Sequence, residues 1–325
     1  MTGSDGLRFE IVADDPMNPA ENSEVVIFPG ARRPDRRYSV DAAGLEISVV
    51  EWGDREHSPM LFAHGGFDFA ETLNVFAPLL AAEGWRVVSW DHRGHGNSAW
   101  ADLYSWEADL RDAASVLETL GPAPLPMVGH SKGGALSLQL AEAFPHRFTH
   151  LVNLDGMPSR RSMPDVAEHE RTKMLAKELD VWLDHRRRVS DKVRRPGTLD
   201  ELATRRGLMN TRLSHEWLRY LVTVGGRRDA DGWRWRIDPT LRMGGFGPWR
   251  PEWSMMRLPG LSMPFMAVLG LELEVMGWGT RPSDVTPYLP SGARFEQLEG
   301  IGHFMHIEQP ELIRDMMVDF VGNPT

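Results

Sequence analysis

Short apolar segments alternate with helical segments along most of this chain, and no other feature of the sequence limits the fold as strongly. Continuous apolar or β-branched runs predict strands up to residue 155, and periodic apolar residues between them predict helices. Parallel strands have such continuous runs because helices bury both faces of their sheet. The expected strands are 44–52, 58–64, 84–91, 125–129 and 150–155, and the expected helices are 71–83, 105–120 and 132–144. The alternation therefore predicts an α/β fold with a mostly parallel central sheet and helices on both faces.

The alternation is interrupted over residues 158–262, where several helices with Trp-rich and Gly-rich loops are expected instead. This stretch contains 22 basic and 14 acidic residues, a formal charge of +8, whereas the rest of the chain carries −18. It also contains six of the 12 Trp residues. Such a shift in composition marks a separate structural unit. Further strands are then expected at 264–270 and 293–298, and a last helix at 310–321.

The sequence thus predicts one core that is interrupted by one insertion. We expect an N-terminal arm at 1–24, a core formed by 25–157 and 263–325, and a mainly helical insertion at 158–262. The arm is polar and contains two prolines, which is typical of a loosely packed terminal segment.

The composition excludes several classes of protein. The chain has no Cys, which rules out a disulfide scaffold, a zinc–thiolate site, an iron–sulfur cluster and a Cys nucleophile. Its net charge of −10 disfavours general binding of nucleic acid. It has neither a secretory signal pattern nor a run of about 18 apolar residues, so we expect no membrane span and a cytoplasmic location. We expect a small molecule as the partner and no cofactor. Whether the protein forms a homodimer is left as a possibility.

The segment Val128-Gly129-His130-Ser131-Lys132-Gly133-Gly134 follows an expected strand and begins an expected helix. In this context G-x-S-x-G is typical of a nucleophile elbow, a tight turn that projects the Ser hydroxyl from the edge of the sheet. The flanking glycines are needed because the turn leaves no room for side chains. The alternative is an ordinary Gly-rich turn with a capping Ser. We interpret Ser131 as the candidate nucleophile.

Four motifs together resemble the α/β-hydrolase family, and they occur in the same order as in that family. They are Leu61-Phe62-Ala63-His64-Gly65-Gly66, Asp91-His92-Arg93-Gly94-His95-Gly96-Asn97-Ser98, Gly129-His130-Ser131-Lys132-Gly133-Gly134 and Gly302-His303-Phe304. The resemblance covers 45–157 and 263–321 and implies the α/β-hydrolase fold, with a cap, or lid, inserted after the sixth strand, where 158–262 lies. It implies little about the substrate, because one fold supports many chemistries.

The resemblance also implies roles for individual residues. The backbone N–H groups of Gly66 and Lys132 would form the oxyanion hole. His303, in the loop before the last helix, would be the general base. His306 is the alternative base, but the glycine directly before His303 favours His303. The two histidines of the 91–98 motif suggest a metal, yet no carboxylate spacing supports one, so we expect a structural turn and no metal site.

The acid of the triad is harder to assign. The family usually carries an Asp in the loop after strand 264–270, and here that loop contains only Glu272 and Glu274 as acids. A spacing variant in the family corresponds to Glu274, whereas other members carry the acid after the preceding strand, which corresponds to Asp155. Glu274 is our first choice, followed by Asp155 and then Glu272. The acid would fix the tautomer of the base and stabilise its protonated form.

The aromatic and Met side chains of 158–262 suit an apolar or aromatic substrate. We expect Phe67, His130, Trp235 and Trp249 to line the substrate pocket. The preferred function is a serine hydrolase that cleaves an ester, lactone or related carboxylic derivative through an acyl-enzyme. A carbon–carbon bond hydrolase, an acyltransferase and a cofactor-free haloperoxidase are alternatives that keep the same nucleophile. The third hypothesis is a non-catalytic ligand receptor, which the missing Asp motivates.

Overall fold

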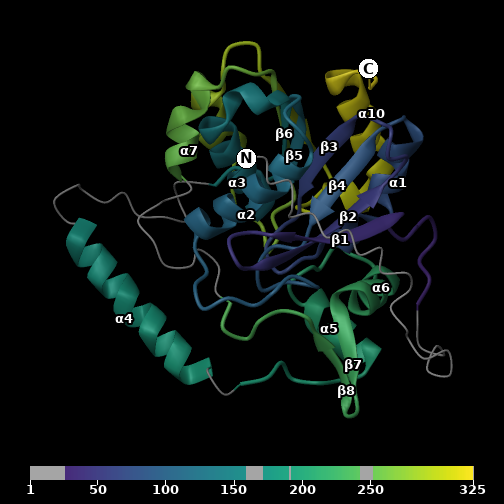
Figure 1. The fold of residues 1–325 in the computed structure, drawn as a ribbon, viewed down its shortest axis with the longest axis vertical. Coiled ribbons are helices and arrows are strands. Elements are labelled where there is room, and N and C mark those ends of the chain that lie inside the picture. Colours follow the sequence, from purple (N-terminus) through teal and green to yellow (C-terminus); the bar gives the residue numbers. More distant parts are fainter. Residues whose placement is uncertain (1–25, 159–170, 190–191, 242–251, 325) are drawn as a thin grey trace, which may run out of the picture.

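The computed structural model describes residues 26–158, 171–189, 192–241 and 252–324 (Figure 1). Eight strands form one sheet in the order β1-β2-β4-β3-β5-β6-β9-β10. These strands are β1 (Arg36–Asp41), β2 (Glu46–Trp52), β3 (Pro59–Ala63), β4 (Arg86–Trp90), β5 (Leu125–His130), β6 (Phe148–Leu154), β9 (Phe265–Gly270) and β10 (Arg294–Leu298). β2 pairs antiparallel with β1 and β4, and all other neighbours are parallel. The predicted mostly parallel sheet is confirmed.

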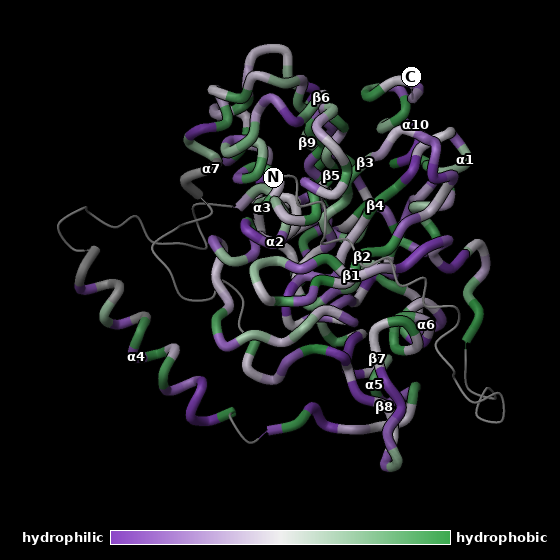
Figure 2. The backbone as a smooth tube through the Cα atoms, in the orientation of Figure 1, coloured by the Kyte–Doolittle hydropathy of each residue, from purple (hydrophilic) through white to green (hydrophobic). Residues whose placement is uncertain are grey.

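Helices cover both faces of this sheet (Figure 1). Successive side chains of β3 point to opposite faces, as the two-residue period of a strand requires. Leu61 and Ala63 pack with the helices of one face, and Met60 and Phe62 pack with the helices of the other. The first face carries α2 (Trp106–Thr119), α3 (Lys132–Ala143) and α7 (Glu252–Arg257), and the second carries α1 (Phe76–Ala82) and α10 (Pro310–Val321). Figure 2 shows that the central strands are largely hydrophobic, which agrees with burial on both faces.

The elements between β6 and β9 pack against different parts of the protein. They are α4 (Arg171–Val189), α5 (Leu199–Gly207), α6 (His215–Gly225), the hairpin β7 (Gly226–Asp229) and β8 (Gly232–Trp235), and α7. α5, α6 and the hairpin form a group whose apolar cluster includes Trp217 and Trp233 together with Phe69 and Phe304 from loops of the core. By contrast, Met255 of α7 packs within the core of the sheet. The described insertion therefore touches the core at more than one place.

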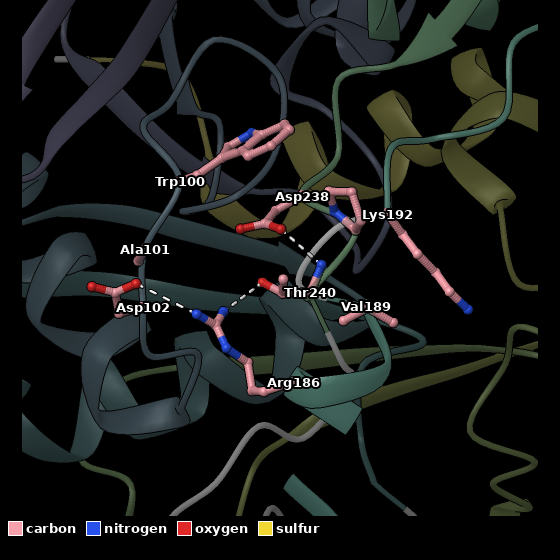
Figure 3. A pocket seen from close by; sticks show the side chains of 9 residues that line it. Trp100, Ala101, Asp102, Arg186, Val189, Lys192, Asp238 and Thr240 are labelled. Carbon is pink, nitrogen blue, oxygen red and sulfur yellow. Dashed lines mark hydrogen bonds and ion pairs between the residues drawn. The ribbon is translucent and has the colours of Figure 1, made fainter. Parts of the chain in front are cut away.

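Helix α4 extends along one side of the molecule (Figure 1). Its C-terminal half is held by Arg186, which donates to Thr240 Oγ1 at 2.8 Å and lies 3.4 Å from Asp102 Oδ1. These residues border a surface cavity of about 250 Å³ (Figure 3). The cavity contains none of the candidate catalytic residues. No helix within the described ranges is long and apolar enough to cross a membrane.

Most predicted elements agree with the structure to within a few residues, and the differences occur in exposed or short segments. β1, an edge strand with half-exposed residues, was not predicted, because Arg36–Asp41 lacks a clear apolar alternation. The hairpin of β7 and β8 was also not predicted. Two short helices, α8 (Pro282–Val285) and α9 (Met305–Glu308), follow β9 and β10.

Candidate active site

Ser131 lies between β5 and α3, in the sharp turn that its sequence motif predicts. Its backbone has φ 54° and ψ −120°, a conformation that is strained for a residue with a side chain. The neighbouring glycines are required sterically, since a Cβ on Gly129 would lie 2.4 Å from the carbonyl oxygen of Gly133, and one on Gly133 would lie 2.1 Å from that of Ala63. The turn therefore fixes the Ser131 side chain at the carboxyl edge of the sheet.

His303 lies in the loop between β10 and α9 and forms hydrogen bonds through both ring nitrogens. Its Nε2 is 2.8 Å from Ser131 Oγ, and its Nδ1 is 2.5 Å from Asp155 Oδ2. Asp155 directly follows β6, with φ 46°, and its N–H donates to the carbonyl of Val268. A carboxylate can only accept, so Nδ1 carries the proton and Nε2 faces the hydroxyl as an acceptor. The structure thus brings Ser131, His303 and Asp155 together.

The first-choice acid, Glu274, does not bond the ring of His303. Its Oε2 accepts the backbone N–H of His303 at 2.7 Å, and its Oε1 has no hydrogen-bond partner among the described residues. Burial raises the pKa of Glu274, and the hydrogen bond from His303 opposes that shift. Glu272 is exposed. The reason for the difference is geometric: β6 and β9 are neighbours, so acids after both strands reach the His303 loop, and the Asp155 side chain is the one that meets the imidazole.

The expected oxyanion donors lie on two segments that meet at Ser131. A Cβ on Gly65 would lie 3.2 Å from Cβ of Ser131, so the loop that contains Gly66 passes directly beside the nucleophile. Lys132 is the first residue of α3, where backbone N–H groups lack helical partners. Among the described residues, neither the N–H of Gly66 nor that of Lys132 donates to another group. Both are therefore available to an incoming oxygen.

The side chain of Lys132 is part of a buried ion pair. Its Nζ is 2.7 Å from Oδ2 of Asp109 on α2, and it lies 5.9 Å from the centre of the Trp106 ring. The pair is almost completely buried. It ties the start of α3 to α2, directly behind the nucleophile. Nothing in the local sequence around Asp109 identified this contact.

The expected pocket residues have different surroundings. Phe67 and Trp235 are half-buried beside the apolar cluster of α5 and α6, and Trp235 stacks on Phe69 with ring centroids 5.9 Å apart. His130 differs from the expectation, because it is fully buried and its Nε2 donates to the carbonyl of His303 at 2.8 Å. This hydrogen bond from His130 supports the His303 loop. Trp249 lies outside the described residues.

Within the described part of the chain, five buried histidines besides His303 lie around the site. They are His64, His92, His95, His130 and His306. Burial lowers the pKa of His64 and of His306 to about 3, and it lowers the pKa values of the other three well below the usual value. His306, the alternative base, packs against the rings of Phe62, Phe76 and His130. His64, His92, His95 and His130 form hydrogen bonds through their ring nitrogens, whereas His306 is held by ring contacts. We expect none of the five to titrate near neutral pH.

We expect the protein to lose stability steeply below pH 6.5. The unfolded chain binds protons at these histidines near pH 6.5 and the folded chain does not, so unfolding is favoured as the pH falls toward 3. Each histidine contributes up to about 1.4 kcal/mol per pH unit, and a net loss on the order of 5 kcal/mol is expected between pH 7 and 5. Asp68, whose pKa burial raises to about 6, opposes this in part.

Urea unfolding at pH 7, 6 and 5 measures this effect. Replacement of the exposed His57 by Gln is the control and should leave the pH dependence unchanged. A free energy of unfolding that stays constant over this range would contradict the neutral state of the buried histidines.

The fold and the arrangement of these side chains define a class: an α/β protein with a Ser–His–Asp site at the carboxyl edge of its sheet. The comparison with known proteins agrees. A family model described as the alpha/beta hydrolase fold matches residues 58–310. The chain therefore belongs to the α/β-hydrolase family, and the predicted fold class is confirmed.

Individual relatives have only modest sequence identity to this chain. A serine hydrolase-like protein of Dictyostelium discoideum is 33% identical over 117 residues, which are 34% of this chain and 32% of that protein. The sn-1-specific diacylglycerol lipase ABHD11 of Mus musculus is 26% identical over 83% of each chain. Among solved structures, the thioesterase domain from the curacin biosynthetic pathway has a TM-score of 0.74 and 24% identity, covering 87% of this chain and 98% of that domain. The first of these relatives is thus matched over only about a third of its length.

Proposed function

We propose that this protein is a serine hydrolase that cleaves carboxylic esters with Ser131, His303 and Asp155. The observation that carries the proposal is the pair of hydrogen bonds, 2.8 Å and 2.5 Å, that join the three side chains through the two nitrogens of one imidazole. This is the geometry that a nucleophile, its general base and the acid that orients the base require. The hydrolase and lipase names of the relatives support the reaction class.

The reaction proceeds in two acyl-transfer steps. Ser131 Oγ attacks the ester carbonyl while its proton moves to Nε2 of His303, and Asp155 stabilises the imidazolium. The N–H groups of Gly66 and Lys132 donate to the oxygen that becomes negative. His303 then protonates the leaving alcohol, and the acyl group stays on Ser131. Water attacks this acyl-enzyme with His303 again as base, which releases the acid and restores the hydroxyl.

The surroundings of the site favour an ester with an apolar acyl or alcohol group. Phe67 follows the oxyanion donor Gly66, and Phe304 follows His303, and both contact the apolar cluster of α5 and α6. Trp235 extends this surface. Aromatic side chains of this kind bury hydrocarbon favourably while the polar donors orient the ester. The name of the mouse relative, a diacylglycerol lipase, supports an ester with an acyl chain.

The insertion 158–262 acts as the cap in this proposal. Basic residues of the insertion contact acidic groups of the core: Arg212 Nε donates to Glu308 Oε2 at 2.9 Å, and Arg257 Nε, at the end of α7, lies 2.8 Å from Glu142 Oε1. Glu308 in turn accepts the N–H of Gly302, next to the base. The Arg212–Glu308 pair therefore joins insertion and core beside the His303 loop, which supports a cap that adjoins the site.

A series of p-nitrophenyl esters tests the function and its substrate class. Each acyl methylene that becomes buried contributes about 0.8 kcal/mol, so kcat/KM should rise about 4-fold per methylene until the pocket is filled. Replacing Trp235 by Ala should reduce this slope and leave acetate hydrolysis nearly unchanged. Absence of hydrolysis with every ester would contradict the proposal. Methanol or hydrogen peroxide as competing acceptors, with product analysis, separates hydrolysis from acyl transfer and from peroxide chemistry.

A further inference from the structure

Phe67 has an unusual backbone in the loop that carries the oxyanion donor. It follows Gly66 directly, and its φ of 57° lies in the left-handed region, which is rare for a bulky aromatic residue. Strain of this kind persists only where the surroundings hold it. Both backbone groups of Phe67 are held by side chains rather than by other backbone groups. Its N–H donates to Nε2 of His95 at 3.1 Å, and its carbonyl accepts from Nη1 of Arg206 at 2.8 Å.

The two side chains that hold Phe67 come from different parts of the chain. His95 belongs to the turn motif after β4, and its Nδ1 is 3.0 Å from the carbonyl of Arg93. A carbonyl can only accept, so Nδ1 carries the proton and Nε2 is the acceptor that Phe67 needs. Arg206 belongs to α5 in the insertion, 139 residues from Phe67. The core therefore supplies one contact and the insertion supplies the other.

The sequence of α5 explains why Arg206 faces the core. The helix begins with a capping box, in which Thr198 Oγ1 accepts the N–H of Glu201 and Glu201 accepts the N–H of Thr198. Leu202 and Ala203 are buried on the side that packs against the core. Arg206 follows Leu202 by four residues and Ala203 by three, so it lies on the same face of the helix. Arg205 points elsewhere and donates to the carbonyls of Glu201 and Pro196.

The charge of Arg206 is balanced by the residue after Phe67. Burial lowers the pKa of Arg206 and raises the pKa of Asp68 to about 6, and each group opposes the shift of the other. The two are not joined by a hydrogen bond, and Nε and Nη2 of Arg206 have no partner in the described part of the chain. The bond to the Phe67 carbonyl is therefore the only hydrogen bond of the Arg206 side chain among the described residues.

We propose that Arg206 is a positioning residue that holds the Gly66–Phe67 turn, so that helix α5 of the insertion determines the geometry of the oxyanion hole. The inference rests on the proposed hydrolase function. Without the guanidinium, the Phe67 carbonyl loses its donor and the strained turn can relax, which moves the N–H of Gly66 away from the developing oxyanion. Misplacement by about 1 Å can cost on the order of 100-fold in rate, whereas the accompanying shift of the Phe67 ring, which lines the proposed pocket, should change KM much less.

The test compares Arg206→Met with Arg205→Met, its matched neighbour on the same helix, in the full-length chain. For the p-nitrophenyl ester that wild type hydrolyses best, Arg206→Met should lower kcat about 10- to 100-fold with less than about 3-fold change in KM. The affinity of a boronic acid that mimics the tetrahedral intermediate should fall by a similar factor. Arg206→Lys, which can still donate one hydrogen bond to the carbonyl, should recover part of kcat. Arg205→Met should match wild type in all three measurements.

The outcomes separate the inference from the function on which it rests. Equal kcat and equal boronate affinity in Arg206→Met and Arg205→Met would overturn the positioning role while wild-type hydrolysis still supports the function. If wild type hydrolyses no ester, the function and the inference fail together. If Arg206→Met does not fold, the comparison of Arg206→Lys with Arg205→Lys decides, because several-fold lower kcat only in Arg206→Lys is expected and equal values would overturn the role.

Discussion

Replacing Ser131 by Ala should lower kcat/KM for ester hydrolysis by about 10⁴- to 10⁶-fold, which is the usual range when the nucleophile of a triad is removed. The variant removes only the Oγ atom, which lies 2.8 Å from His303 Nε2. It should fold normally, because the strained backbone of this turn tolerates Ala as well as Ser. Steady-state kinetics with purified enzyme, together with circular dichroism, give both results.

A control for this variant is Ser137→Ala on α3, the helix that follows Ser131. The Ser137 hydroxyl is buried and donates to the carbonyl of Gly134, so its removal perturbs α3 without touching the site. We expect activity within a few-fold of wild type. If Ser131→Ala retained more than a small fraction of activity, Ser131 would not be the nucleophile.

Replacing Asp155 by Asn should lower kcat by about 10³- to 10⁴-fold, whereas Glu274→Gln should lower it by less than about 10-fold. The Asn amide can present an N–H to Nδ1 and so favours the wrong tautomer, in which Nε2 can no longer accept the Ser131 proton. Gln at 274 keeps a carbonyl oxygen that can still accept the backbone N–H of His303. The two variants change one acid each and leave the same net charge, so they form a matched pair.

The ratio of these two effects identifies the acid. The double variant is expected to resemble Asp155→Asn. A large loss in Glu274→Gln with near-normal activity in Asp155→Asn would reverse the assignment and return Glu274, our first choice from the sequence, to the triad.

The sheet and its order along the chain were predictable because their signals are local. Most strands are continuous apolar or β-branched runs, and the elbow of Ser131 needs its two glycines within five residues of sequence. The position of His303 followed from its motif and its place before the last helix. Such features depend on residues that are close together in the chain.

The acid could not be assigned in the same way, because the choice depends on tertiary structure. Asp155 and Glu274 follow neighbouring strands, and both reach the His303 loop. What separates them is the group that each acid contacts: Asp155 accepts from the imidazole, whereas Glu274 accepts from the backbone N–H of His303. The contact of Arg206 with Phe67 is even harder to predict from the sequence, since no local pattern marks a residue whose partner is 139 positions away. The sequence therefore predicts which residues belong to such a site better than it predicts which of them contact one another.

The central claim, that Ser131 is a nucleophile activated by His303, is tested most directly by labelling with a fluorophosphonate and locating the adduct by mass spectrometry. We expect a single phosphonylated residue, Ser131, with ester hydrolysis lost in proportion to the label and no adduct in Ser131→Ala. An unlabelled Ser131 in active enzyme, or hydrolysis that persists when Ser131 is fully labelled, would contradict the account.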